Sequence, residues 1–148
     1  MLKVYFENEH ICLRYDEELQ LGIGQWKGFV SSNELRAMAL HTLEFANTHG
    51  ITRWLSDRRK MRAIRQQDQQ WTVEEFIPKV LASPLRRVAT IVSEDIFNNM
   101  AVEQMLKRSG GLGDISLRDF NNEAEAMEWL KQPLEQESSM ETGASSAD

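Results

Sequence analysis

The first 30 residues contain two runs in which apolar and polar side chains alternate. The apolar positions of these runs are Ile11, Leu13, Tyr15, Leu19, Leu21 and Ile23. Alternation with a period of two places the apolar side chains on one face of a β-strand. The polar residues 16–18 between the runs are a turn candidate. The pattern therefore predicts two or three antiparallel strands at the start of the chain.

Helical spacing begins after this hairpin. Ser31 and Glu34 have the spacing of a capping box, and Gly50 can adopt the left-handed conformation that ends a helix. These signals predict a helix over 31–50. Hydrophobic periodicity predicts the following further elements: strands at 51–56, 87–93 and 115–120, and helices at 66–82, 95–110 and 122–132.

Two of these elements have features of their own. Pro78 lies inside the predicted helix 66–82 and cannot donate to the carbonyl of Glu74, so we expect a kink or a break there. The strand at 87–93 is an almost continuous apolar run, which is typical of a central strand covered on both faces.

This order of elements predicts an α/β fold. Alternating helices and strands favour right-handed crossovers and a mixed β-sheet, with the N-terminal antiparallel hairpin at one edge. We expect residues 1–132 to form a single domain. Residues 133–148 are acidic, with four carboxylates and no Lys or Arg, and they show no packing pattern, so we expect a disordered tail.

Composition narrows the class of protein. The chain has 148 residues, 41% of them hydrophobic, and its apolar runs are too short to cross a bilayer. Cys12 is the single cysteine, so no intrachain disulfide can form. The first residues lack the pattern of an export signal. We therefore expect a cytoplasmic protein without a transmembrane segment.

Positive charge is concentrated in one stretch, although the whole chain carries a net charge of −6. Residues 53–65 contain six cations and one acid, Asp57, a local charge of +5. We expect residues 57–65 to form a loop after the strand 51–56, at the carboxyl end of the sheet, where ligands bind in open α/β folds. The candidate binding residues in this loop are Asp57, Arg58, Arg59, Arg62 and Arg65.

Two interpretations of this stretch stay open. Guanidinium groups can bind a phosphate or carboxylate through paired hydrogen bonds, while Trp54 and Trp71, which flank the stretch, can wall a pocket for an amphiphile. Alternatively, the cations form a solvated loop and both tryptophans belong to the core.

The chain resembles one family in its pattern of strands and in scattered residues. The segments that carry the resemblance are 51–57, the basic stretch, 70–78, 87–92, Trp26, Phe120 and 126–130. Over roughly residues 4–131 they resemble the SpoIIAA-like bacterial proteins, relatives of the STAS domains, with a superfamily-level likeness to CRAL-TRIO lipid-binding domains. The resemblance implies a mixed sheet with packed helices and a regulatory, partner-docking role.

The switch of the STAS antagonists does not carry over to this chain. In STAS antagonists, an anti-sigma kinase phosphorylates a Ser or Thr that stands just after a strand-ending Asp. Asp57 matches the acidic position, but Arg58, Arg59 and Lys60 follow it, so no hydroxyl stands at the acceptor position. The resemblance therefore implies docking without this phosphorylation.

We find no motif for catalysis or for a cofactor. His10, His41 and His49 lack the spacing of a zinc site, and Gly22-Ile23-Gly24 lies inside a strand without the third glycine of a dinucleotide motif. A single basic stretch on an acidic chain offers few phosphate contacts, so we do not expect specific nucleic-acid binding. We expect neither enzymatic activity nor a cofactor.

Two hypotheses of function follow. The first is a non-catalytic STAS-like module that binds a protein partner or itself through the loop at Asp57 and the helix 73–81. The alternative is a binder or carrier of a small anionic amphiphile, held by the arginines and walled by Trp54 and Trp71. An enzyme of unknown class is a third, weaker possibility.

Overall fold

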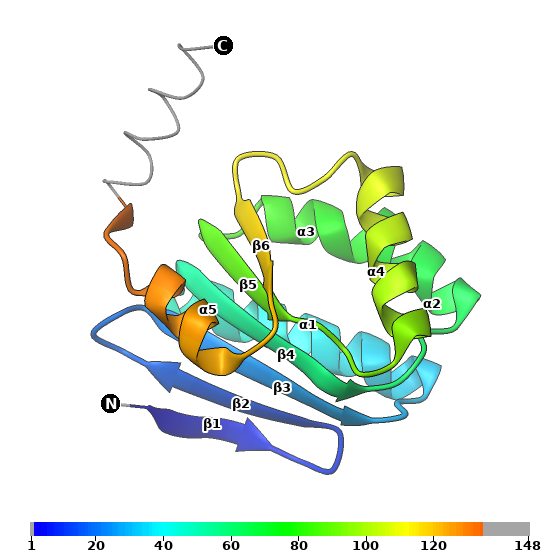
Figure 1. Ribbon diagram of the computed structural model, residues 1–148, viewed down its shortest axis with the longest axis horizontal. Coiled ribbons are helices and arrows are strands. Elements are labelled where there is room, and N and C mark those ends of the chain that lie inside the picture. Colours follow the sequence, from blue (N-terminus) through cyan, green and yellow to red (C-terminus); the bar gives the residue numbers. More distant parts are fainter. Residues whose placement is uncertain (1, 135–148) are drawn as a thin grey trace.

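The computed structural model describes residues 2–134, which form a six-stranded sheet with helices on both faces (Figure 1). The strands stand in chain order across the sheet: β1 (Lys3–Glu7), β2 (Ile11–Asp16), β3 (Leu21–Gly28), β4 (Arg53–Met61), β5 (Arg87–Ile91) and β6 (Ser116–Phe120). The pairs β1–β2 and β2–β3 are antiparallel, and the pairs from β3 to β6 are parallel. The predicted α/β fold with an antiparallel hairpin at one edge is confirmed. Nearly all of the predicted tail, residues 135–148, lies outside the described residues.

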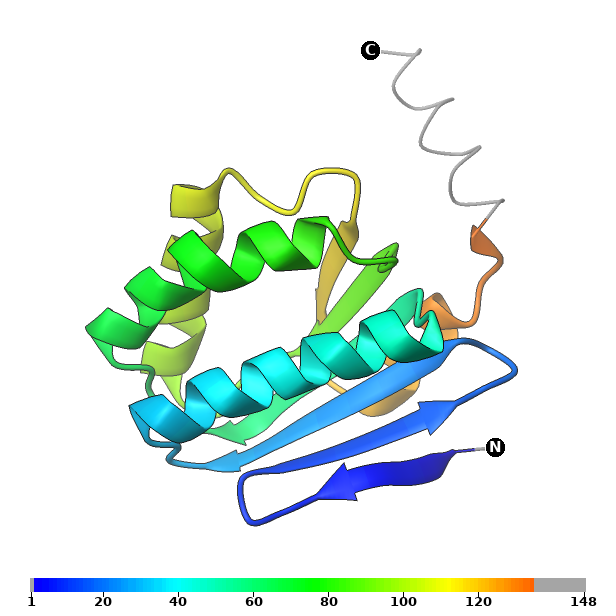
Figure 2. The ribbon, with the colours of Figure 1, turned by 180° about the vertical axis from the view of Figure 1, so that it is seen from behind.

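The connecting helices share one face of the sheet. α1 (Ser32–His49), the helical residues 66–81 and α4 (Ile96–Ser109) each join two parallel strands and lie on this face, whereas α5 (Glu123–Leu130) covers the other (Figures 1 and 2). Crossovers of one hand that advance in one direction place their helices on the same side. The helix between β4 and β5 has three parts, α2 (Gln66–Trp71), the π-helical segment η1 (Thr72–Phe76) and α3 (Ile77–Leu81).

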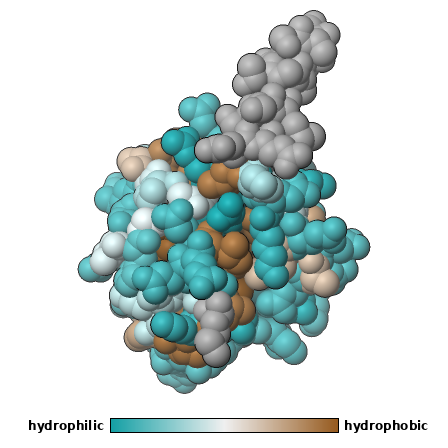
Figure 3. Space-filling view, turned by 90° about the vertical axis from the view of Figure 1, so that its left-hand side faces the viewer, coloured by the Kyte–Doolittle hydropathy of each residue, from teal (hydrophilic) through white to brown (hydrophobic). Residues whose placement is uncertain are grey.

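Each face of the sheet has its own core. Phe45, Trp54 and Val88 pack on the α1 side, and Leu55, Ala89 and Leu130 pack on the α5 side. All residues of β5 are buried, as expected for a strand covered on both faces. At the left-hand end of the molecule in Figure 1, most of the surface is hydrophilic, and apolar groups show through the middle of the view and in smaller spots near its edges (Figure 3). None of the helices within residues 2–134 has the length and apolar composition needed to cross a bilayer.

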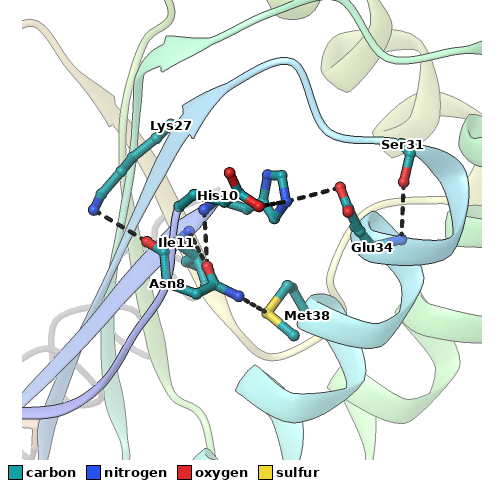
Figure 4. A network of polar contacts seen from close by, with 8 residues as sticks. Asn8, His10, Ile11, Lys27, Ser31, Glu34 and Met38 are labelled. Carbon is teal, nitrogen blue, oxygen red and sulfur yellow. Dashed lines mark hydrogen bonds and ion pairs between the residues drawn. The ribbon is translucent and has the colours of Figure 1, made fainter.

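The start of α1 is fixed to the N-terminal hairpin. The Ser31 hydroxyl accepts from the Glu34 backbone N–H at 3.4 Å, which confirms one half of the predicted capping box, and Gly50 ends the helix at φ 60°. The Glu34 carboxylate instead reaches His10 Nε2, at 2.9 Å. Asn8 completes this network: its side chain holds the turn before β2 and donates to the sulfur of Met38 (Figure 4).

The predicted loop 57–65 is wrong in its first part. β4 continues to Met61, and it pairs with β3 as far as Lys27↔Lys60 and Gly28↔Met61. The run of charges suggested exposure, but Asp57 and Arg58 are both buried because each has polar partners inside the protein. Successive side chains of a strand point to opposite faces, so the basic stretch is divided between the two sides of the sheet.

The expected kink or break at Pro78 takes another form. The helix runs on from residue 66 to 81, and η1 directly precedes α3. In η1 the hydrogen bonds are wider than in an α-helix, with the Ile77 N–H donating to the carbonyl of Thr72. Pro78 follows this wider turn directly, at the start of α3, where a regular α-helix would need its N–H to donate to the carbonyl of Glu74.

Candidate functional site

A partly enclosed cavity of about 230 Å³ lies between the sheet and the helices of the α1 side. Most of the residues that line it are apolar. They are Trp26, Ala39, Thr42, Leu43, Ala46, Trp54, Ser56, Arg58, Thr72, Phe76, Ile77, Val80, Leu85, Val88, Thr90, Val102, Met105, Leu106, Leu112 and Leu117. An apolar cavity of 150 Å³ in another protein is large enough to bind benzene, so this one can hold a small organic molecule.

The arrangement of the helices leaves this space open. α4 packs against α2 and η1, its neighbours in the helix layer (Figure 2). Of the four side chains that α1 turns toward the cavity, three are small, Ala39, Thr42 and Ala46, and the fourth is Leu43. The π-helical segment η1 contributes Thr72 and Phe76 to the wall of the cavity. π-helical turns are frequent at functional sites.

Two glycines of β3 shape the floor of the cavity. The indole of Trp54 lies over Gly22 and Gly24, and a Cβ at these positions would stand 2.3 Å and 2.8 Å from the ring. Contacts this short are not possible without movement of the indole. The G-x-G sequence of β3 therefore provides room for Trp54.

One buried cation faces the cavity. Arg58 is 7% exposed, and its Nη1 donates to the side-chain oxygens of Asn98 at 2.6 Å and Asn99 at 3.4 Å. Its Nε is buried and has no hydrogen-bond partner among the described residues. Burial lowers the pKa of Arg58, and Asp119, at longer range, raises it. No ion pair of Arg58 is found within residues 2–134, so its charge is held by neutral amides.

Hydroxyl groups lie near this cation in the sheet. Ser56 precedes Arg58 by two residues on the same face of β4, and it stands beside Thr90 of β5 in register. The Thr90 hydroxyl donates to the Asp119 carboxylate. The next row toward the start of the strands is apolar, with Trp54, Val88 and Leu117 in register. The floor of the cavity is therefore apolar at one end and polar, with a cation, at the other.

The next two candidate residues face the opposite side. Asp57 accepts from Arg59 Nε at 3.0 Å and from Arg59 Nη2 at 2.7 Å. Burial alone raises the pKa of the Asp57 carboxyl, but the hydrogen bonds and charge of Arg59 outweigh it, so the pKa lies below its ordinary value. This pair is internally satisfied and lies outside the cavity lining.

The remaining candidates, Arg62, Arg65 and Trp71, are not among the residues that line this cavity. Arg62 and Arg65 are exposed at the carboxyl edge of the sheet, and the Arg65 guanidinium lies 5.0 Å from the ring centre of Phe29. Trp71 stacks on Phe76 at 6.1 Å between ring centres and is not among the described residues that line the cavity. Of the seven candidates, the structure brings Trp54 and Arg58 together in this cavity, whereas Arg62 and Arg65 line a separate small pocket of about 10 Å³.

Most of the lining could not be predicted from the sequence. Trp26 and Thr90 were not singled out as site residues, and the small residues of α1 were assigned to an ordinary core face. One signal was present: Ala39, Thr42 and Ala46 place small side chains at helical spacing on a single face. Such a face leaves room beneath a helix.

Comparisons with protein-family models, curated proteins and solved structures found no match to this chain. The resemblance to STAS and SpoIIAA-like domains stays a prediction. Within the described part of the chain, no group of three or more His, Cys, Asp or Glu side chains is placed to hold a metal ion.

Proposed function

We propose that this domain binds a small anionic amphiphile, with the apolar part over Trp54 and Val88 and the anionic group at Arg58. The observation that carries the proposal is the combination of an apolar cavity of about 230 Å³ with a buried guanidinium that forms no ion pair within residues 2–134 and leaves its Nε without a hydrogen-bond partner there. An anion at the free edge of Arg58 supplies both the missing charge and the missing hydrogen-bond acceptor.

The size of the cavity supports a ligand. Left empty and closed, an apolar cavity of about 230 Å³ costs up to about 5.5 kcal/mol, at roughly 24 cal/mol per Å³. Small domains are stable by only about 5–15 kcal/mol in total. A space of this size is therefore a large fraction of the stability of the fold, and a bound apolar group recovers much of that loss.

The geometry supports this function better than it supports docking through the basic stretch. Docking on one surface requires the arginines to face one way, whereas Arg58 and Arg59 lie on opposite faces of the sheet. The STAS-like partner-binding module remains a prediction from the resemblance.

The test fills the cavity and measures ligand binding. Ala39→Phe places a ring in the cavity from α1, and Ala37→Phe makes the same change at an exposed position of the same helix. We expect decanoate to raise the unfolding temperature of the wild type and of Ala37→Phe, and to leave that of Ala39→Phe unchanged. Saturation at about 100 times Kd corresponds to about 2.7 kcal/mol of stabilisation.

Native mass spectrometry of the full chain gives an independent measurement. We expect a co-purified molecule on the wild type and on Ala37→Phe, and none on Ala39→Phe. If Ala39→Phe does not fold, Thr42→Leu fills the same cavity with a smaller change. The proposal would be overturned if decanoate raised the unfolding temperatures of Ala39→Phe and Ala37→Phe equally. It would also be overturned if no straight-chain acid raised the unfolding temperature of the wild type.

A further inference from the structure

We propose that the carboxyl edge of the sheet docks on an anionic lipid surface. Four large apolar side chains are exposed there: Phe29, Ile96, Phe97 and Met100 are 53%, 65%, 66% and 49% exposed. We call these four residues the apolar patch. They lie where β3 ends and α4 begins, at the right-hand end of the molecule in Figure 1.

The backbone of Arg62 connects the end of β3, which precedes Phe29, with the start of α4, which carries the other three residues of the apolar patch. Its backbone N–H donates to the carbonyl of Gly28, the residue before Phe29, at 3.2 Å. Its carbonyl accepts from the side chain of Asn98, the residue after Phe97, at 2.9 Å. The residues next to Phe29 and Phe97 are therefore both hydrogen-bonded to the backbone of Arg62, so the two exposed rings belong to neighbouring segments.

Cations flank the patch and are free to contact anions. Arg62 and Arg65 are exposed, and neither forms an ion pair with any residue of 2–134. Two acids lie at the same edge and keep their charges: the Asp95 carboxylate accepts from the Phe97 N–H at 2.9 Å, and Glu94, which is exposed, raises the pKa of Arg59. The acidic groups elsewhere on the chain are screened beyond about 8 Å at physiological salt.

Apolar side chains among unpaired arginines are the pattern of a protein surface that inserts into anionic membranes. The patch is also next to the polar end of the cavity, since Asn98 bonds both Arg58 and the carbonyl of Arg62. A docked domain therefore presents this end of the cavity to the bilayer. The docking itself does not require a loaded cavity, so it goes beyond the proposed function.

The experiment is co-sedimentation of the full chain with vesicles of phosphatidylglycerol and phosphatidylcholine, compared with vesicles of phosphatidylcholine alone. We expect binding to the anionic vesicles that falls as salt rises. Removing Arg62 or Arg65 with alanine should weaken it about fivefold each. Phe97→Ser should weaken it at least about tenfold. Leu40→Ser, at a 41% exposed position on α1, is the matched control and should bind as the wild type does.

Each outcome decides the inference. Equal binding to neutral vesicles, equal losses in Phe97→Ser and Leu40→Ser, or no binding to either vesicle overturns it. Self-association that Phe97→Ser abolishes, without vesicle binding, assigns the patch to a protein contact instead. Ala39→Phe separates this inference from the proposed function, because a filled cavity should leave vesicle binding unchanged.

Discussion

Arg58 holds a positive charge at a position that is more than nine-tenths buried, with only amide oxygens as partners among the described residues. Taking a charge out of water is unfavourable unless an opposite charge accompanies it. An uncompensated buried charge destabilises a fold, so a neutral group in its place is not expected to lower stability. The burial of Arg58 without an ion pair among the described residues therefore supports the proposed anion site.

Arg58→Gln tests this role directly. Gln keeps a donor for Asn98 and removes the charge, so we expect no loss of unfolding temperature in the ligand-free protein. Decanoate affinity, measured by calorimetry, should fall about 10- to 100-fold, while decanol affinity should not change. Arg59→Gln is the control: it leaves Asp57 buried without its cation, so it should lower stability and keep the preference for decanoate. If Arg59→Gln weakened decanoate binding and Arg58→Gln did not, the proposed site would be contradicted.

Asp57 predicts a dependence of stability on pH. Its pKa in the folded protein lies below the ordinary value of 3.8, because the contribution of Arg59 outweighs that of burial. A lowered folded-state pKa stabilises the protein above the unfolded value, and this stabilisation is lost as pH falls below it. We expect the urea midpoint of the wild type to drop below about pH 4 and that of Asp57→Asn to drop less. Asp114→Asn, at an exposed position, controls for the loss of one charge and should follow the wild type.

At the scale of elements, β3 and β4 are fitted to one another through Trp54. The two glycines of β3 leave the area that the indole occupies, and Trp54 in turn forms the floor of the cavity. A glycine in a strand normally weakens it, because it adds chain entropy and buries no side chain. Here the glycines are required by the ring beside them.

We therefore expect Gly22→Ala to lower the free energy of unfolding, although alanine often raises it at a glycine position. Alanine at a compatible glycine site stabilises a protein by about 0.4–1 kcal/mol. At Gly22 the new Cβ stands 2.3 Å from the indole, so we expect a loss of about 1–3 kcal/mol in the free energy of unfolding. The double variant with Trp54→Leu should recover most of this loss in a double-mutant cycle. Additive effects of the two substitutions would contradict the packing of Trp54 on β3.

The elements themselves followed from local patterns. Alternation, caps and the buried run of β5 predicted the order of strands and helices because these signals lie within a few residues of one another. The end of β4 did not follow, since the burial of Asp57 and Arg58 depends on Arg59, Asn98 and Asn99. Trp54 and Arg58 were predicted as site residues, but the cavity depends on how far α4 stands from the sheet, which no local pattern records.

At the scale of the molecule, the two faces of the sheet have different roles. The α5 side is closed by packed apolar residues and by Arg87, whose guanidinium binds the carbonyls of Trp129, Gln132 and Pro133 at the end of α5. The α1 side keeps the cavity. The polar end of the cavity and the apolar patch lie at the same edge of the sheet, so the proposed ligand site and the proposed docking surface are close together.

The most direct measurement of the central claim is NMR of the full chain with ¹³C-labelled decanoate. We predict contacts from the decanoate methylenes to the Trp54 indole and the Val88 methyls. The bound carboxyl should titrate at a lower pH than free decanoate, because the charge of Arg58 favours the anion. Decanoate that contacts only exposed side chains, or a carboxyl that titrates as it does in water, would contradict a ligand held between this sheet and its helices.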